Sequence, residues 1–216
     1  MRALVIGASG GIGGALAARL AGQGAEVVAL SRRADGLDLT DGAAVERVLG
    51  GVTGPFEQIW VASGVLESPE KALKAMTPEG LMRAFAVNAM GPALVMRHIA
   101  RLMPRDRPAR FAALSARVGS IGDNRLGGWY AYRSAKAALN QLVHTAAIEM
   151  ARTHPQAVVV ALHPGTVETG LAPAQRAGHP AVAPEVAAAN LLAVLERLRP
   201  DQSGGFFDWK GEAVPW

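Results

Sequence analysis

Short apolar runs alternate with helical patterns along the chain, and this alternation constrains the fold more than any other feature. The runs are continuously apolar, which is typical of strands buried on both faces of a mostly parallel sheet. Parallel strands need crossover connections, which are right-handed and usually helical. The expected strands are residues 3–6, 26–30, 58–63, 110–114, 157–162 and 204–209. The expected helices follow Gly11 and span 77–103 (with Gly91-Pro92 as a place to break), 130–153 and 184–198.

The length and composition fit one globular unit. The 216 residues are 50% apolar and show no long linker or repeat, so residues 1–216 are expected to form a single α/β domain with both cofactor and substrate sites. We expect a doubly wound, mostly parallel sheet of about seven strands with helices on both faces. The chain has no cysteine and no histidine pair at metal-ligand spacing, so neither disulfides nor a metal site are expected.

Charge and hydropathy indicate a cytoplasmic protein that binds neither nucleic acid nor membrane. No apolar run reaches the roughly 20 residues that span a bilayer. The apolar stretch near the N-terminus is shorter than a signal-peptide core of roughly 7–15 residues, so it is interpreted as a strand. The net charge is +4, but the basic residues are dispersed and no aromatic platform accompanies them. An arginine-rich surface explains the excess, and part of it can serve an anionic cofactor.

A glycine-rich turn, VIGASGGIGG, follows the first expected strand and opens the first helix. Glycine lets the backbone turn sharply and approach a pyrophosphate, and the helix N-terminus offers free N–H groups. With a strand before it and a helix after it, the turn predicts a dinucleotide site of the Rossmann type. The alternative is a helix start that merely packs on the sheet. The expected contacts are Gly7, Ser9, Gly11, Ile12 and Gly13.

The end of the second expected strand indicates which dinucleotide binds. A site that prefers NAD usually has a carboxylate there for the ribose hydroxyls, but this chain has Ser31, Arg32 and Arg33. Arginine makes charge-assisted hydrogen bonds to phosphate oxygens, so NADP(H) is favoured and NAD(H) is the alternative. The arginines can also simply face solvent.

Tyr132 and Lys136 lie four residues apart in a strongly helical stretch, so they share one face of the helix. A tyrosine normally titrates near 10. A nearby ammonium favours the phenolate and lowers that pKa, which would make Tyr132 a useful acid. Without other features, an exposed pair on a helix surface is the better explanation of the spacing. Tyr130 has Ser134 at the same spacing and is not a candidate acid.

The glycine turn, Tyr132-x-x-x-Lys136 and HPGTVETG (163–170) occur in this order on one α/β chain, which resembles the short-chain dehydrogenase/reductase family. The segments LSARVGSIGDN and GGFFDWKGEAVPW look most like the small C-factor or sniffer-type carbonyl reductases. The resemblance implies hydride transfer between a nicotinamide and the carbonyl carbon of a small aldehyde or ketone, or the corresponding alcohol. Tyr132 would be the general acid. Lys136 would lower its pKa and hold the nicotinamide ribose.

The resemblance also gives expectations for two polar residues near the tyrosine. Asn88, a poor residue for the middle of a helix, would disturb its helix and hold a water that relays protons toward the lysine; an exposed or capping Asn is the alternative. The family's substrate-orienting serine falls on Ala116 here. Its neighbour Ser115 is the candidate, although neighbours on a regular strand face opposite sides unless a bulge intervenes, and Ser120 is another hydroxyl nearby.

Further cofactor contacts follow from the resemblance. They come from the residue expected near the adenine, from the turn that replaces the family's Asn-Asn-Ala-Gly, and from the loop beside the nicotinamide. The residues are Asp38, Ala62, Ser63, Gly64, Pro164, Gly165, Val167 and Thr169. The interval from Leu30 to Asp38 leaves no room for the family's usual second crossover helix. A short, apolar lid between Thr169 and Pro184 indicates an open, tolerant carbonyl site.

Two other functions and one assembly remain open at this point. A protein of the same fold can bind the cofactor yet act mainly as a signal or sensor, with weak or no catalysis, and the missing serine supports this alternative. A nucleotide-sugar epimerase or dehydratase needs an added C-terminal substrate domain of many more residues. The alanine-rich helix 130–153 can pack against its copy in a homodimer, or can simply cover the sheet.

Overall fold

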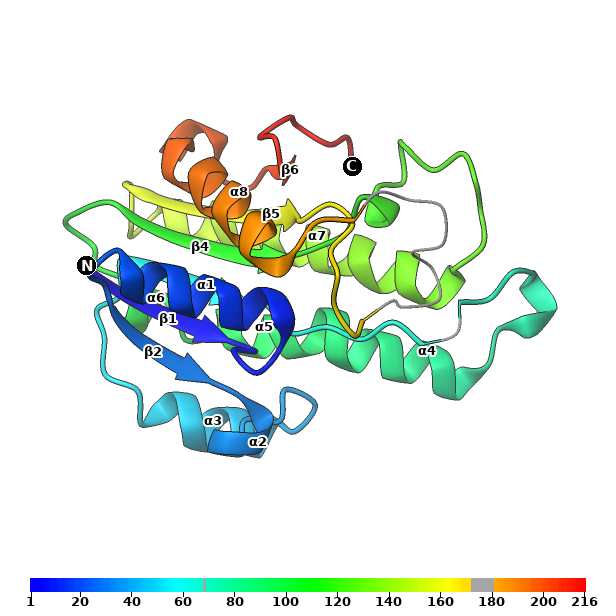
Figure 1. The fold of residues 1–216 in the computed structure, drawn as a ribbon, viewed down its shortest axis with the longest axis horizontal. Coiled ribbons are helices and arrows are strands. Elements are labelled where there is room, and N and C mark those ends of the chain that lie inside the picture. Colours follow the sequence, from blue (N-terminus) through cyan, green and yellow to red (C-terminus); the bar gives the residue numbers. More distant parts are fainter. Residues whose placement is uncertain (68, 172–180) are drawn as a thin grey trace.

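The computed structural model describes residues 1–67, 69–171 and 181–216, and its centre is one parallel sheet (Figure 1). The strand order is β2-β1-β3-β4-β5-β6, and all five pairings are parallel. The chain runs from β1 outward to the edge strand β2, then crosses back to β3, so the direction of winding reverses between β1 and β3. The strands are β1 (Arg2–Ile6), β2 (Glu26–Leu30), β3 (Gln58–Val61), β4 (Ala109–Leu114), β5 (Ala157–His163) and β6 (Phe206–Asp208).

Helices cover both faces of this sheet, which confirms the doubly wound α/β fold (Figure 1). One face is covered by α1 (Gly11–Gly22) and α8 (Pro184–Arg197), and the other by α3 (Gly42–Gly50), α5 (Gly91–Met96), α6 (Ile99–Leu102) and α7 (Tyr130–Ala151). Alternate residues of one strand enter opposite cores: Leu4 faces the α7 side and Val5 the α1 side. Both sets are buried, which explains why the strands are continuously apolar.

The described residues form six strands, one fewer than the seven or so expected. Among the described residues, no strand flanks β2 on its outer side. The connection from β2 to β3 instead contains a single turn, α2 (Arg32–Asp35), and then α3, which the sequence reading missed. The Asp41 carboxylate caps α3 by accepting a hydrogen bond from Ala43 N at 2.9 Å. Helix α2 has only one turn, which agrees with the expectation that the interval from Leu30 to Asp38 has no room for a full crossover helix.

The helical region expected at 77–103 is interrupted, as the Gly91-Pro92 pair allowed. It consists of α4 (Pro78–Phe85), a π-helical turn (Ala86–Met90), α5 and α6. Gly91 begins α5 in close contact with Leu39, because a Cβ on Gly91 would lie 2.7 Å from the Leu39 side chain. Three 3-10 turns complete the described elements: Leu73–Ala75, Arg117–Gly119 and Pro200–Gln202.

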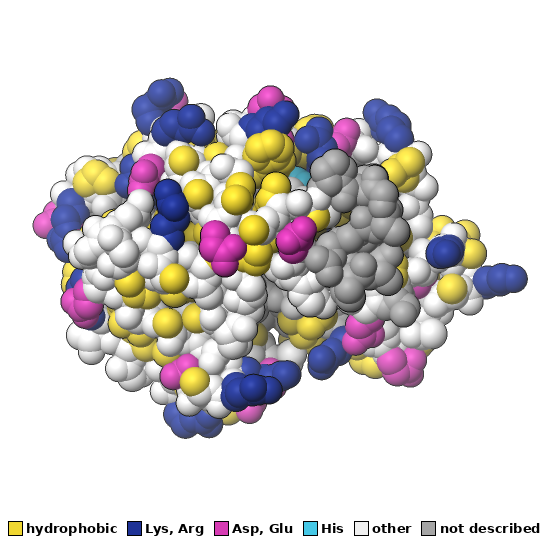
Figure 2. Space-filling model, in the orientation of Figure 1, with side chains coloured by type: hydrophobic (Ala, Val, Ile, Leu, Met, Phe, Trp, Pro, Cys, Tyr) yellow, Lys and Arg dark blue, Asp and Glu magenta, His cyan; other side chains and the backbone are white. Residues whose placement is uncertain are grey.

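Three observations bear on binding partners. On the face drawn in Figure 2, lysines and arginines are scattered and interleaved with acidic side chains. Among residues 1–67, 69–171 and 181–216, no helix is long and apolar enough to cross a membrane. The same residues contain no cluster of three or more His, Asp or Glu side chains suited to a metal ion.

Candidate active site

The glycine turn lies where the sheet reverses its winding, and its glycines are required by contact. A Cβ on Gly7, whose φ is +87°, would lie 2.7 Å from Ser63 Oγ. A Cβ on Gly13 would overlap the Gly7 carbonyl, so α1 starts directly against the turn. A Cβ on Gly11 would lie 2.8 Å from Thr169 Cγ2. The turn therefore brings the predicted residues after β3 and after β5 into one place.

The start of α1 suits an anion. Gly10 at its N-cap position offers no side chain to cap the helix, and its first turn holds no acidic residue. Its leading N–H groups and the positive end of the helix dipole thus lack a competing protein carboxylate. Ser9 is exposed beside this helix start, and Ile12 packs against the core. These residues fit the phosphates of a dinucleotide.

The first residues after β2 cap the N-terminus of the one-turn helix α2. Ser31 Oγ accepts a hydrogen bond from Ala34 N at 3.2 Å, and Ser31 N donates to the Asp35 carboxylate at 2.7 Å. Arg32 and Arg33 are exposed, which agrees both with binding of a cofactor phosphate and with side chains that simply face solvent. Asp35 is a nearby carboxylate that sequence reasoning overlooked.

Asp38 is ordered by its neighbour rather than by the arginines. Its Oδ1 accepts hydrogen bonds from Thr40 Oγ1 at 2.7 Å and Thr40 N at 2.9 Å. These bonds, with smaller contributions from the charges of Arg32 and Arg83, lower the pKa of the Asp38 carboxyl. Asp38 therefore stays ionised at the end of the loop that follows α2.

Tyr132 and Lys136 form a buried pair, so the exposed-surface alternative is wrong. Both lie on the face of α7 that packs against the end of the sheet. Lys136 Nζ donates a hydrogen bond to the Leu114 carbonyl at the end of β4, at 2.8 Å. The same nitrogen lies 5.8 Å from the centre of the Tyr132 ring. The i, i+4 spacing thus places the ammonium beside the phenol, as the sequence predicted.

Burial controls the protonation of this pair. Loss of hydration raises the pKa of Tyr132 to about 12 and lowers the pKa of Lys136 to about 7. The direction for Tyr132 is opposite to the predicted lowering, because desolvation of the phenolate outweighs a lysine that is itself only partly charged near neutral pH. Tyr132 is consequently a protonated phenol at pH 7, which is the form that a general acid needs.

Asn88 is fully buried in the π-helical turn, and its side chain bonds the backbone of the segment that follows β3. Its Oδ1 accepts a hydrogen bond from Val65 N at 3.0 Å, and its Nδ2 donates to Val65 O at 2.9 Å. A Cβ on Gly64 would lie 3.2 Å from Asn88 Oδ1 and 3.9 Å from Lys136 Nζ. The predicted residues Gly64, Asn88 and Lys136 therefore meet, and the exposed-Asn alternative is wrong.

The predicted serine is directed elsewhere. Ser115 is buried, and its Oγ donates a hydrogen bond to Asn140 Oδ1 at 2.6 Å. Asn140 lies two helical turns beyond Tyr132 on α7, so this bond does not direct the hydroxyl at the phenol. Ser120 donates to the Pro215 carbonyl. Ala116, the residue after Ser115, is partly exposed.

The sequence after β5 forms the other side of the site. Burial lowers the pKa of His163 to about 4, so its imidazole is neutral and packed. The backbone at Gly165 lies against an indole that the sequence reading missed, since a Cβ there would be 3.0 Å from Trp209 Cδ1. Val167 forms a β-bridge with Val182, which joins the two described ends of the expected lid. Most of that lid, residues 172–180, lies outside the described residues.

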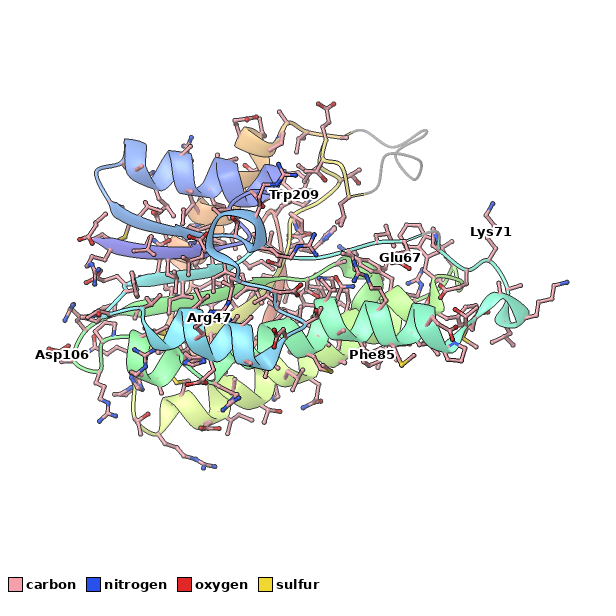
Figure 3. The ribbon with its side chains drawn as sticks, turned by 90° about the horizontal axis from the view of Figure 1, so that it is seen from below. Arg47, Glu67, Lys71, Phe85, Asp106 and Trp209 are labelled. Carbon is pink, nitrogen blue, oxygen red and sulfur yellow. The ribbon has the colours of Figure 1, made fainter. Side chains whose placement is uncertain are left out.

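A cavity of about 260 Å³ opens beside Tyr132. Its walls come from the segment after β3, from α4 and from the start of α7. The lining residues are Val65, Leu66, Glu67, Pro69, Glu70, Ala75, Thr77, Gly80, Ala84, Ala131 and Tyr132. The lining mixes polar and apolar groups rather than being apolar as expected, and it includes two carboxylates that sequence reasoning did not single out. Figure 3 shows Glu67 above α4, where it pairs with Arg83 at 3.4 Å.

Comparison with known proteins assigns the chain to a family. A family model described as short chain dehydrogenase matches residues 34–180, which is more than half of the chain. The chain belongs to the short-chain dehydrogenase/reductase family. Oxidoreductase chemistry is therefore the activity of its family. The C-signal protein of Myxococcus xanthus is 34% identical over 160 residues, covering 73% of this chain and 86% of that protein.

A second relative spans nearly the full length. The 1-hydroxy-2-glutathionyl-2-methyl-3-butene dehydrogenase of Rhodococcus sp. is 28% identical over 99% of this chain and 98% of its own. Among solved structures, the carbonyl reductase Sniffer of D. melanogaster superposes with a TM-score of 0.84 at 19% identity, over 100% of this chain and 99% of that one. An NADPH-bound carbonyl reductase from chicken fatty liver gives 0.86 at 22%, over 100% and 98%. These two similarities establish the fold.

Proposed function

We propose that the protein uses NADPH to reduce the carbonyl group of small aldehydes or ketones. The observation that carries this proposal is the position of the buried Tyr132–Lys136 pair. The pair lies between the glycine turn and a partly open cavity of about 260 Å³ that is lined by both polar and apolar groups. A cofactor held at the turn and a carbonyl held in the cavity would meet beside the phenol. The NADPH- and NADP-bound structural neighbours support the choice of cofactor.

The cofactor would supply the hydride, and this chain supplies the binding groups. The N–H groups at the start of α1 would bind the diphosphate, and Arg32 and Arg33 would bind a 2′-phosphate with charge-assisted hydrogen bonds. Backbone groups after β3 and β5 would hold the nicotinamide half. The overlap that any side chain at Gly13 would create supports this cradle, because only a bare backbone permits such close approach.

Tyr132 would complete the reduction by donating its phenolic proton to the carbonyl oxygen as hydride arrives at the carbon, giving the alcohol. The phenol would be left as a phenolate, and a proton on Lys136 would stabilise that charge from its position 5.8 Å from the ring centre. Asn88 would keep the Val65 backbone and the cavity wall in register with this pair. Ser115 is left out of the mechanism, because its hydroxyl bonds Asn140.

The test is NADPH oxidation with reactive aldehydes, diketones and quinones, comparing Tyr132→Phe with Tyr130→Phe. Tyr130 is a matched control, since it lies on the same helical turn and differs only in position. We expect turnover to vanish in Tyr132→Phe and to persist in Tyr130→Phe, with NADPH affinity kept in both. Equal activity of the Tyr132 variant and the wild type would refute the assignment of the acid.

A second function has specific support. The relative named C-signal is 34% identical, and Ala116 stands where the family's serine is expected. The same fold could therefore bind NADP(H) mainly as a signalling or sensor protein with little catalysis. Tight NADPH binding by the wild type without turnover of any carbonyl tested would favour this alternative.

A further inference from the structure

Helix α7, which carries Tyr132 and Lys136, begins without a cap from its own sequence. Trp129 occupies the N-cap position with φ 55° and ψ 39°, and its side chain accepts no hydrogen bond from the helix. The first turn contains no acidic residue. The first N–H groups of a helix have no partners inside it, so a partly buried helix start needs acceptors from another part of the chain.

Glu70 provides two of these acceptors from the segment after β3. Its backbone carbonyl accepts a hydrogen bond from Trp129 N at 2.7 Å, and its carboxylate accepts one from Ala131 N at 3.4 Å. A carboxylate in this place also interacts favourably with the positive end of the helix dipole. The approach depends on Gly128, with φ +65°, where a Cβ would lie 3.2 Å from the Glu70 carbonyl.

The hydrogen bond between Glu70 and Trp129 also affects Tyr132, because the Trp129 indole packs against the Tyr132 ring. A left-handed backbone is strained for a bulky residue such as Trp129, so it persists only where its surroundings fix it. In that conformation the indole meets the Tyr132 ring edge-on, with centroids 6.3 Å apart and planes at 62°. Glu70 thus holds the residue that packs directly against Tyr132.

The same residue is part of the cavity wall. Glu70 and Tyr132 both line the 260 Å³ cavity. The wall segment is attached to the helices near both ends, at Val65 through the Asn88 amide and at Glu70 through the start of α7. The attachment at Glu70 therefore couples the position of the wall to the position of Tyr132.

We propose that Glu70 is a positioning residue that clamps the start of α7 to the cavity wall and thereby holds Tyr132 in place for proton transfer. Its effect on turnover rests on the proposed function. Its effect on the helix start does not, because the two hydrogen bonds are formed by the protein alone.

The test combines kinetics with amide hydrogen exchange on Glu70→Ala, Glu70→Gln and the control Lys71→Ala. The Gln side chain keeps an oxygen that can accept from Ala131 N, whereas Ala removes it. Lys71 is the next residue on the same segment, is exposed, and points away from the rest of the chain (Figure 3). The readouts are exchange of the amides of residues 129–132, the Kd for NADPH, and kcat and KM with NADPH and 4-nitrobenzaldehyde.

We expect Glu70→Ala to speed exchange at 129–132 by at least 10-fold and to lower kcat by about 10-fold, since small displacements of reacting groups are costly. The Kd for NADPH should stay within twofold. Glu70→Gln and Lys71→Ala should behave like the wild type. Unchanged exchange in Glu70→Ala would overturn the clamp, and so would Glu70→Gln as impaired as Glu70→Ala. A wild type without turnover would refute the proposed function alone, and the exchange data would still test the clamp.

Discussion

Replacing Lys136 with Met should reveal how strongly the fold shifts the pKa of this lysine, because the replacement changes the pH dependence of stability. Burial lowers the pKa of Lys136 from 10.5 to about 7. The unfolded chain therefore binds more protons between these two values, so stability conferred by this group rises with pH across that window. At about 1.4 kcal/mol per pKa unit, ionisation of Lys136 disfavours folding by about 4 kcal/mol at pH 7 but only about 2 kcal/mol at pH 9.

Methionine has nearly the same length and carries no proton, so the variant lacks this pH dependence. It also leaves the Leu114 carbonyl without the 2.8 Å hydrogen bond from Nζ, at a cost of about 1–3 kcal/mol that does not vary with pH. The absolute stability difference at one pH thus mixes two effects. The change in that difference between pH 7 and pH 9 isolates the ionisation of the lysine.

Urea unfolding of the protein without cofactor, at pH 7 and pH 9, measures this change. The free energy of unfolding of Lys136→Met minus that of the wild type should fall by about 2 kcal/mol from pH 7 to pH 9. Lys71→Met, at an exposed position, should show no such change. A constant difference for Lys136→Met would refute the argument, because it would mean that the buried lysine keeps an ordinary pKa.

Three further substitutions test the site. Ala116→Ser restores the family's hydroxyl beside the cleft and should raise kcat/KM for carbonyl reduction about 10-fold; an unchanged value would show that this position does not reach the substrate. Gly13→Ala should raise the NADPH Kd at least 10-fold in a fluorescence titration, because its Cβ overlaps the turn, whereas Gly22→Ala, where a Cβ meets nothing within 4 Å, should leave it unchanged. Arg32→Ala and Arg33→Ala should each weaken NADPH binding about 10-fold without affecting NADH, in parallel titrations of both cofactors.

The sheet could be predicted from the sequence because the strands are short, continuous apolar runs, which are typical of strands buried on both faces of a sheet. Helix α3 escaped notice because GAAVERVLG is short and begins and ends with glycine. Its one clear signal was Asp41, a strong N-cap residue directly before it. The resemblance anticipated that Asn88 disturbs its helix, but not that the disturbance is a π-helical turn in which Asn88 bonds Val65, a partner set by the tertiary fold.

The site was predictable to the extent that its residues carry local patterns. The glycine turn and the Tyr132–Lys136 spacing are local, and the structure places both as expected. Glu70 has no such pattern, because its partner Ala131 is 61 residues further along the chain. The hydrogen bond of Ser115 could not be predicted for a related reason: proximity to Ala116 in sequence says nothing about Asn140, which accepts that bond.

The raised pKa of Tyr132 shows why spacing alone predicts the wrong direction for a pKa shift. The i, i+4 relation predicts an ammonium near the phenol and hence a lowered pKa, but it contains no information on how much water surrounds the pair. In the fold both groups are buried, so the phenol titrates at about 12 and the lysine at about 7. A lysine half charged at neutral pH responds to any negative charge brought close to it, because that charge favours its protonated form. Binding an anionic cofactor beside Lys136 should therefore take up a proton near pH 7–8, and a calorimetric titration in buffers of different ionisation enthalpy would detect that uptake, whereas Lys136→Met should show none.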